Sequence, residues 1–253
     1  MRRIALSAVA ALTLFAGSAF AEEGVKQPTD LKWSFEGVFG KFDAKARKRG
    51  FQVYNTTCGA CHSLRLLSYR NLMDIGFTED EVKAIAAEFE VEAGPNDEGE
   101  MYARPALLSD KFVSPFANEK AARAANGGAL PPDLSVIIKA RKNGADYLHA
   151  LLTGYLDEAP EGFALGEGMN YNDYFPGRQI AMSAPLFDEG VEYDDGTKAT
   201  LDRQAKDVVE FLTWAASPEL EARKSLGVKV MAFLIVLTIM LYAVKRKVWK
   251  DMH

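Results

Sequence analysis

One uninterrupted apolar segment near the C-terminus constrains the fold of this 253-residue chain more than any other feature. Residues 226–244 carry a single charged side chain, Lys229, which lies near one end of the segment. A helix of this length spans about 28 Å, close to the hydrocarbon thickness of a bilayer, and the Lys229 ammonium can extend to the interface. The alternative is a buried core helix. The length favours a single membrane-spanning helix.

The first residues read as an export signal. Arg2 and Arg3 precede a short apolar run, and Ala19-Phe20-Ala21 has the small-x-small pattern of a cleavage site. An uncleaved N-terminal anchor is the alternative, but the run is short for a bilayer. We therefore expect residues 1–21 to be a signal peptide.

The basic cluster Lys245-Arg246-Lys247 follows the apolar run directly. Basic residues favour the cytoplasmic side of a membrane, so the C-terminus should be inside, as the export signal also requires. We expect a single-pass protein of the bacterial inner membrane. Its predicted parts are a periplasmic domain (22–225), a transmembrane helix (226–244) and a cytoplasmic tail (245–253).

The chain has two cysteines, three positions apart, and a histidine follows the second, in Cys58-Gly59-Ala60-Cys61-His62. Two thiols at this spacing can reach the two vinyl groups of a haem, and the imidazole that comes next lies beneath the iron. The motif therefore predicts one covalent haem c, with thioethers at Cys58 and Cys61 and with His62 as an axial ligand.

Three other sites use similar residues. A redox dithiol has the same spacing, but it belongs in a βαβ context that this sequence lacks. A disulfide across two intervening residues would be strained and would add little. A zinc site needs four ligands, and His149 and His253 are the only other histidines.

Hydrophobic periodicity predicts a mainly α-helical body, with Asp or Thr residues placed to cap the helices. The expected helices cover residues 43–54, 78–90, 133–141, 146–152 and 200–216, with caps at Asp43, Thr78, Asp133, Asp146 and Thr200. Pro218 predicts a break before the membrane helix. Strand signals are sparse, and residues 157–200 read as long irregular structure. Loops of that length suit a fold built around a large cofactor.

Spacing does not identify the second axial ligand of the iron. A thioether raises the reduction potential, whereas a second imidazole lowers it. The candidates in the exported body are Met73, Met101, Met169, Met182 and His149.

The exported body is acidic. Residues 22–227 contain 23 Lys and Arg against 34 Asp and Glu, a net charge of −11. In the densest stretch, residues 79–100, only Lys83 opposes nine carboxylates. Such a run is either a solvated face or a surface that steers a basic partner. We expect no nucleic-acid partner.

Several segments, in order along nearly the whole mature chain, resemble the cytochrome c1 family, the haem subunit of the cytochrome bc1 complex (ubiquinol–cytochrome c reductase). They are Arg49-Gly-Phe-Gln-Val-Tyr, Ala121-Ala-Arg-Ala-Ala-Asn-Gly-Gly-Ala-Leu-Pro-Pro-Asp-Leu-Ser, Leu151-Leu-Thr-Gly-Tyr, Tyr174-Phe-Pro-Gly, Tyr193-Asp-Asp-Gly-Thr, Ala205-Lys-Asp-Val and Trp214-Ala-Ala. The family's fold is a cytochrome c-type haem domain with long loops plus one C-terminal membrane helix.

The resemblance implies site residues beyond the haem motif. The segment Gln179-Ile-Ala-Met-Ser-Ala-Pro makes Met182 the sixth ligand. Arg141 and Tyr147 match positions near the haem propionates; otherwise they would be an Arg at a helix C-terminus and a half-buried Tyr. The remaining pocket positions lie in a loop against the haem, which could also be a plain helix-entry turn: Asn126, Pro131 and Pro132. With no further cysteine pair, no disulfide should brace the loop before Met182.

The function implied by the resemblance is electron relay, from a Rieske iron–sulfur protein through one haem c to cytochrome c. The chain would have no catalytic site of its own and would act beside cytochrome b in a dimeric complex. Two alternatives stay open. A mobile tethered cytochrome would have a flexible linker before the anchor. A haem enzyme such as a peroxidase would need a distal acid–base group, for which His149 is the remaining exported histidine.

Overall fold

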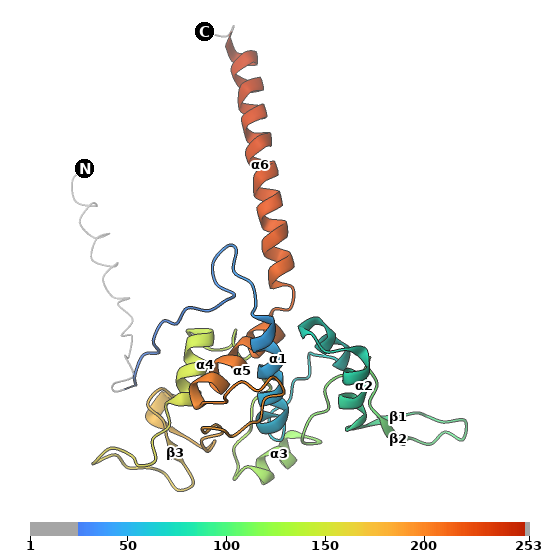
Figure 1. Cartoon of the computed structure of the whole chain (residues 1–253), viewed down its shortest axis with the longest axis vertical. Coiled ribbons are helices and arrows are strands. Elements are labelled where there is room, and N and C mark those ends of the chain that lie inside the picture. Colours follow the sequence, from blue (N-terminus) through green and yellow to red (C-terminus); the bar gives the residue numbers. More distant parts are fainter. Residues whose placement is uncertain (1–24, 251–253) are drawn as a thin grey trace, which may run out of the picture.

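The structure is a computed structural model that describes residues 25–250. The expected signal peptide and His253 lie outside these residues. A body of helices and long loops occupies one end of the molecule, and one long helix projects from it (Figure 1). The prediction of a mainly α-helical chain is confirmed.

Most of the α-helices lie close to where capping and periodicity predict them, but the helix at residues 119–125 was not expected. The α-helices are α1 (Ala44–Val53), α2 (Glu79–Ala87), α3 (Glu119–Ala125), α4 (Gly144–Thr153), α5 (Leu201–Ala216) and α6 (Leu220–Trp249). A π-helical turn, η1 (Tyr54–Cys58), continues α1, and two 3-10 helices are η2 (Tyr69–Ile75) and η3 (Pro176–Arg178). Asp43, Thr78 and Thr200 cap α1, α2 and α5 as expected, because each side chain accepts a hydrogen bond from a backbone N–H of the first turn.

Two short antiparallel strand pairs complete the described structure. β1 (Glu90–Ala93) pairs with β2 (Tyr102–Pro105), so that Glu90 faces Pro105 and Ala93 faces Tyr102. This hairpin extends away from the body (Figure 1). β3 (Asn170–Tyr171) pairs with β4 (Gln179–Ile180) inside the otherwise irregular stretch between α4 and α5.

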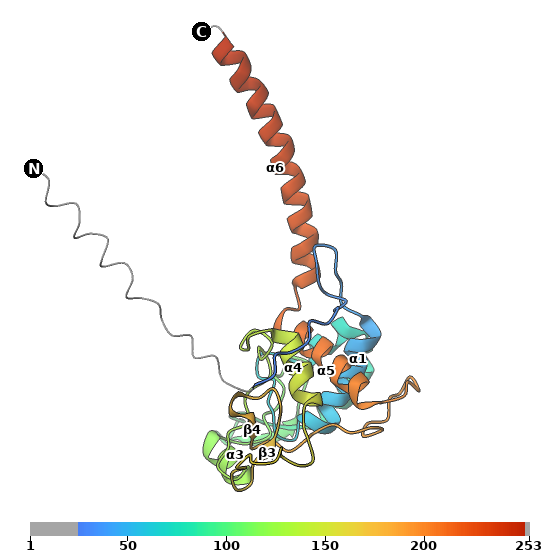
Figure 2. The same cartoon turned by 90° about the vertical axis from the view of Figure 1, so that its left-hand side faces the viewer.

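The core of the body forms where α1 lies against α5 (Figure 2). Phe51 of α1 meets Phe211 of α5 edge to face, with ring centroids 5.7 Å apart. Gly50 is required at this crossing, because a Cβ there would lie 2.0 Å from the backbone oxygen of Asp207. The contact brings the end of α1, and hence the cysteine motif, to a fixed place on the core.

An ion pair locks the same two helices together. The Arg49 guanidinium donates two hydrogen bonds to Asp207, from Nε at 2.7 Å and from a terminal nitrogen at 3.0 Å. The other terminal nitrogen donates to Asp195 at 3.0 Å. The Asp207 side chain is only 1% exposed, so loss of the guanidinium would leave a buried carboxylate without its charge partner, at a cost of about 3–5 kcal/mol.

The structure corrects two helix predictions. Residues 133–141 form successive turns rather than a helix, since most of their backbone hydrogen bonds join residues three apart and Asn143 then adopts a left-handed φ of 62°. Asp146 does not cap α4, which begins after Asn143. The Asp146 carboxylate instead accepts hydrogen bonds from Leu31 N and from Trp33 Nε1, at 3.2 and 2.7 Å. The Asp146 carboxylate therefore bonds to distant residues rather than to the first turn of α4.

The helix α6 contains the apolar run at residues 226–244 and is longer than that run at both ends. Its apolar side chains are exposed along its length, and its most apolar window is 0% buried. Among the described residues it is the one helix long and apolar enough to cross a membrane. The break predicted at Pro218 is present, because α5 ends at Ala216 and α6 starts at Leu220.

Candidate haem site

The cysteine motif is an extension of α1. After the π-helical turn, Gly59 N donates to Tyr54 O at 2.7 Å and His62 N donates to Cys58 O at 2.8 Å. Residues three apart in a helical turn lie on the same side of it. The local backbone therefore presents both cysteines on one side, with His62 directly after them.

Both cysteines are half-buried, and Cys58 packs against the hydrophobic core. Burial, with a smaller contribution from Cys61, raises the pKa of the Cys58 thiol to about 12. Redox-active dithiols work in the opposite way, since their reactive thiol has a lowered pKa. The neutral thiol of Cys58 therefore argues against a redox dithiol and suits an apolar haem edge.

The His62 ring is oriented by a backbone carbonyl. Its Nδ1 lies 2.8 Å from the carbonyl oxygen of Pro132. A carbonyl oxygen can only accept, so Nδ1 carries the proton and Nε2 keeps a free lone pair. Burial also lowers the pKa of His62, which favours the neutral ring. A neutral imidazole whose other nitrogen is held by a carbonyl is the usual form of a metal-binding histidine.

A second group of hydrogen bonds joins the motif to the loop that contains Pro132. The Asp133 carboxylate accepts from Ser63 Oγ at 2.8 Å, from Arg65 N at 2.9 Å and from Ser135 N at 3.0 Å. Burial alone would raise the pKa of Asp133, but these bonds outweigh it and the pKa lies below its ordinary value. Asp133 thus joins the segment directly after His62 to the loop that contains Pro132. Its predicted role as a helix cap did not anticipate this contact.

Tyr54 holds the backbone of His62 in place. Its hydroxyl donates to the backbone oxygen of His62 at 2.8 Å. The sequence placed Tyr54 only at the end of the helix expected at residues 43–54. Its position four residues before Cys58, in the segment that resembles the family, was the available signal.

Met182 lies two residues after β4 and is half-buried. Its backbone oxygen accepts a hydrogen bond from the Tyr155 hydroxyl at 3.1 Å. Burial raises the pKa of Tyr155, and the nearby Tyr147 adds to the effect. Tyr155, which was not among the expected pocket residues, thus links two that were, Met182 and Tyr147. The pairing of the Met182 sulfur with the iron opposite His62 stays a prediction.

The other expected pocket residues have local partners. Arg141 is exposed and donates to the neighbouring backbone oxygen of Ala140 at 3.0 Å. The Asn126 side chain donates to Ala122 O at 2.7 Å, at the end of α3. Pro131 is half-buried beside Pro132. Pro132 is the one of these that directly contacts the haem motif through a hydrogen bond.

The rival metal sites gain no support. Within residues 25–250, no three His, Cys, Asp or Glu side chains are grouped so that they could hold a metal ion. His149 lies on α4, where its Nε2 is 2.9 Å from an oxygen of Asp202 on α5. The residues at the motif, two cysteines and one oriented imidazole, fit a covalent haem.

Comparison with known proteins agrees with this geometry. A family model described as the cytochrome C1 family matches residues 33–252. Cytochrome c1 of Rhodospirillum rubrum is 47% identical over 262 residues, which cover 98% of this chain and 96% of the relative. "Cytochrome c1 1, heme protein, mitochondrial" of Arabidopsis thaliana is 52% identical over 227 residues, 90% of this chain and 73% of the relative. The "Cytochrome b-c1 complex catalytic subunit, mitochondrial" of Candida albicans is 50% identical over 229 residues, 90% of this chain and 79% of the relative. This chain belongs to the cytochrome c1 family.

Proposed function

We propose that this chain is the haem-carrying electron-transfer subunit of a quinol–cytochrome c reductase. It would take single electrons from a Rieske iron–sulfur protein and give them to a cytochrome c. It would work beside cytochrome b in a dimeric bc1 complex, as a subunit without a catalytic site of its own. The names of its relatives, which include a "Cytochrome b/c1" of Bradyrhizobium diazoefficiens, support an assembly with cytochrome b.

The hydrogen bond between His62 Nδ1 and Pro132 O carries the proposal. It prepares the imidazole as an iron ligand on the residue that follows two haem-binding cysteines. A bound haem would supply an iron that changes by one electron. Cys58 and Cys61 would hold the group through thioethers, while His62 and Met182 would bind the iron and set its potential.

The join between the body and α6 favours a rigid mount over a mobile tethered carrier. Only residues 217–219 separate α5 from α6. The first turns of α6 are also tied to the body, since Glu221 accepts a hydrogen bond from Phe42 N at 3.0 Å. A free tether of small and charged residues is therefore not what links the two.

We propose that the body lies on the periplasmic side of the bacterial inner membrane and the C-terminal tail on the cytoplasmic side, following the signal peptide and the basic cluster after residue 244.

A spectrum of the purified membrane protein tests this proposal. The pyridine-haemochrome spectrum should be that of one c-type haem per chain, and it should change when Cys58 or Cys61 is replaced by Ser. A redox titration should show a high potential, with the weak long-wavelength sulfur-to-iron band in the oxidised form. A low potential without that band, or carbon monoxide binding by the native protein, would contradict the relay and favour His149 ligation or an open iron.

A further inference from the structure

A short apolar loop lies beside the base of α6. The loop covers residues 34–41, and its tip is Gly37-Val38-Phe39-Gly40. The Val38 and Phe39 side chains are 64% and 83% exposed, which makes Phe39 the most exposed large apolar residue of the described chain. Figures 1 and 2 both show this loop next to the first turns of α6, on the side of the body from which the helix departs.

The shape of the loop is set by its backbone. Gly37 has a φ of +68°, and a Cβ on Gly40 would lie 1.8 Å from the backbone oxygen of Glu36, so both positions need glycine. Lys41 N donates to Ser34 O at 2.9 Å and closes the loop. The tip is therefore a tight turn that holds its two apolar side chains outward.

The base of the loop is bonded to α6. The Lys224 ammonium donates to Phe35 O at 2.5 Å and to Gly40 O at 3.2 Å. Glu221, one turn earlier on the helix, accepts from Phe42 N. The loop and the helix therefore keep a constant relative position.

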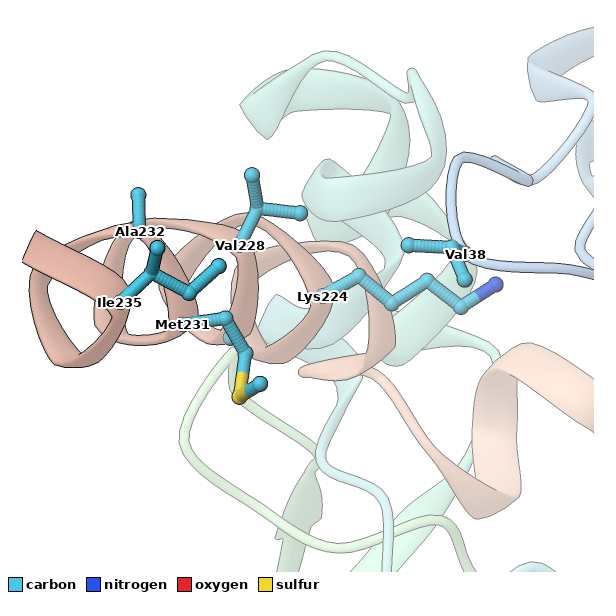
Figure 3. Close-up of a pocket in the computed structure, with 7 residues that line it drawn as sticks. Val38, Lys224, Val228, Met231, Ala232 and Ile235 are labelled. Carbon is cyan, nitrogen blue, oxygen red and sulfur yellow. The ribbon is translucent and has the colours of Figure 1, made fainter. Parts of the chain in front are cut away.

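These bonds set the level of the tip along the helix. Val38 lines an open apolar groove with Gly227, Val228 and Met231 of α6 (Figure 3). The groove is also lined by Lys224, Ala232 and Ile235, so it runs from two residues before Leu226, where the apolar run begins, to nine residues inside it. At about 1.5 Å per residue, the tip lies beside the first ~14 Å of the run.

We propose that Val38 and Phe39 insert among the phospholipid acyl chains of the outer leaflet and give the body a second point of membrane attachment. The proposal rests on α6 crossing the membrane. Lipid is the occupant we infer because the tip continues the exposed apolar surface of α6 at the depth where that surface enters the bilayer. Lys41, directly after the tip, is exposed, and a basic side chain suits the headgroup region there. The second attachment would fix the tilt of the body relative to the membrane.

A spin label at position 39 tests the insertion in the haem-loaded complex reconstituted into phospholipid vesicles. Cys58 and Cys61 would be used by the haem, so an introduced cysteine can be labelled. The test variant is Phe39→Cys. Phe233→Cys, at a residue of α6 that is 64% exposed, is the lipid reference. Leu165→Cys, in the loop between α4 and β3 on the side of the body away from α6, is the water reference (Figure 1).

Power saturation with oxygen and with a water-soluble nickel chelate reports depth. The label at position 39 should be relaxed several-fold more by oxygen than by nickel, like that at position 233 and unlike that at position 165. Relaxation mainly by nickel would place the tip in water and overturn the inference. Protection from both reagents would show that a protein helix covers the tip, which overturns it as well. Nickel access at position 233 would instead contradict the membrane anchor itself, so the two failures are distinguishable.

Discussion

Nδ1 of His62 lies 2.8 Å from the carbonyl oxygen of Pro132, although 70 positions separate the two residues in the chain. The segment after α3 therefore decides which nitrogen of the histidine would be free to bind an iron. A backbone carbonyl makes this contact, so the identity of the side chain at position 132 matters less than the path of the loop. That path depends on Asp133.

Replacing Asp133 by Ala should loosen the loop. The change leaves the donors on Ser63, Arg65 and Ser135 without their acceptor, and we expect a loss of about 1–3 kcal/mol in the free energy of unfolding, measured by urea denaturation. Asp97→Ala, at an exposed carboxylate in the β1–β2 hairpin, is the matched control and should cost less than about 0.5 kcal/mol. Equal effects of the two changes would contradict the bridging role.

The same variant makes a prediction about pH. The pKa of Asp133 is lower in the folded chain than its ordinary value of 3.8. A group with a depressed folded pKa stabilises the fold above its unfolded pKa, and this contribution is lost as the pH falls through the folded value. The stability difference between the native chain and Asp133→Ala should thus be constant near neutral pH and shrink below pH 3.8. A stability difference that grows on acidification would show that folding raises the pKa of Asp133 rather than lowering it.

Met182→Leu should leave the haem covalently attached but lower its reduction potential. A thioether ligand favours the reduced iron, and axial ligands as a group cover a range of about 0.8 V. Potentiometric titration should show a fall that is a clear fraction of that range, together with loss of the sulfur-to-iron band. Met73→Leu and Met101→Leu, at exposed methionines, are controls that should change neither. If Met182→Leu has no effect, the ligand is one of Met73, Met101 and Met169.

We expect the acidic hairpin to make reduction of a basic cytochrome c sensitive to salt. The carboxylates of β1, β2 and their connection are exposed: Glu90, Glu92, Asp97, Glu98 and Glu100. A triple change of Glu92, Glu98 and Glu100 to Gln should slow the bimolecular reaction about tenfold at low ionic strength. The difference should disappear at high salt, where surface charges are screened. Stopped-flow rates that do not depend on salt in the native complex would remove the steering role.

Two glycines near the haem motif should respond differently to the same change. Gly50→Ala forces a Cβ to within 2.0 Å of Asp207 O and 2.7 Å of Phe211 Cβ, so α1 and α5 must move apart. We expect the free energy of unfolding to fall by about 1–3 kcal/mol, measured by thermal unfolding, and the haem content to fall as well. Gly59→Ala, inside the motif, meets nothing closer than 3.4 Å and should fold and bind haem normally. Greater damage from Gly59→Ala would contradict the packing of α1 on α5.

The features that were predictable from the sequence depend on neighbours in the chain. The spacing of Cys58, Cys61 and His62 defines the haem motif in any fold, and the apolar run defines a long helix by its composition alone. The caps at Asp43, Thr78 and Thr200 were also predictable, since a capping side chain and its N–H partners lie within three residues of each other. The resemblance to one family then supplied the expected partners of the motif, and the roles of Met182 and the pocket residues stay predictions.

Which distant groups meet depends on the packing of the whole body. Asp133 and Asp146 both have the sequence context of a helix cap, yet one joins the haem motif to its loop and the other holds Trp33. A carboxylate bonds wherever folding brings the best donors, and the loop that carries Val38 and Phe39 lies beside α6 only because Lys224 and Glu221 bind its ends. Local sequence fixes what each segment can form. Contacts between residues 70 to 189 positions apart depend on how the whole core packs, and no short pattern encodes that.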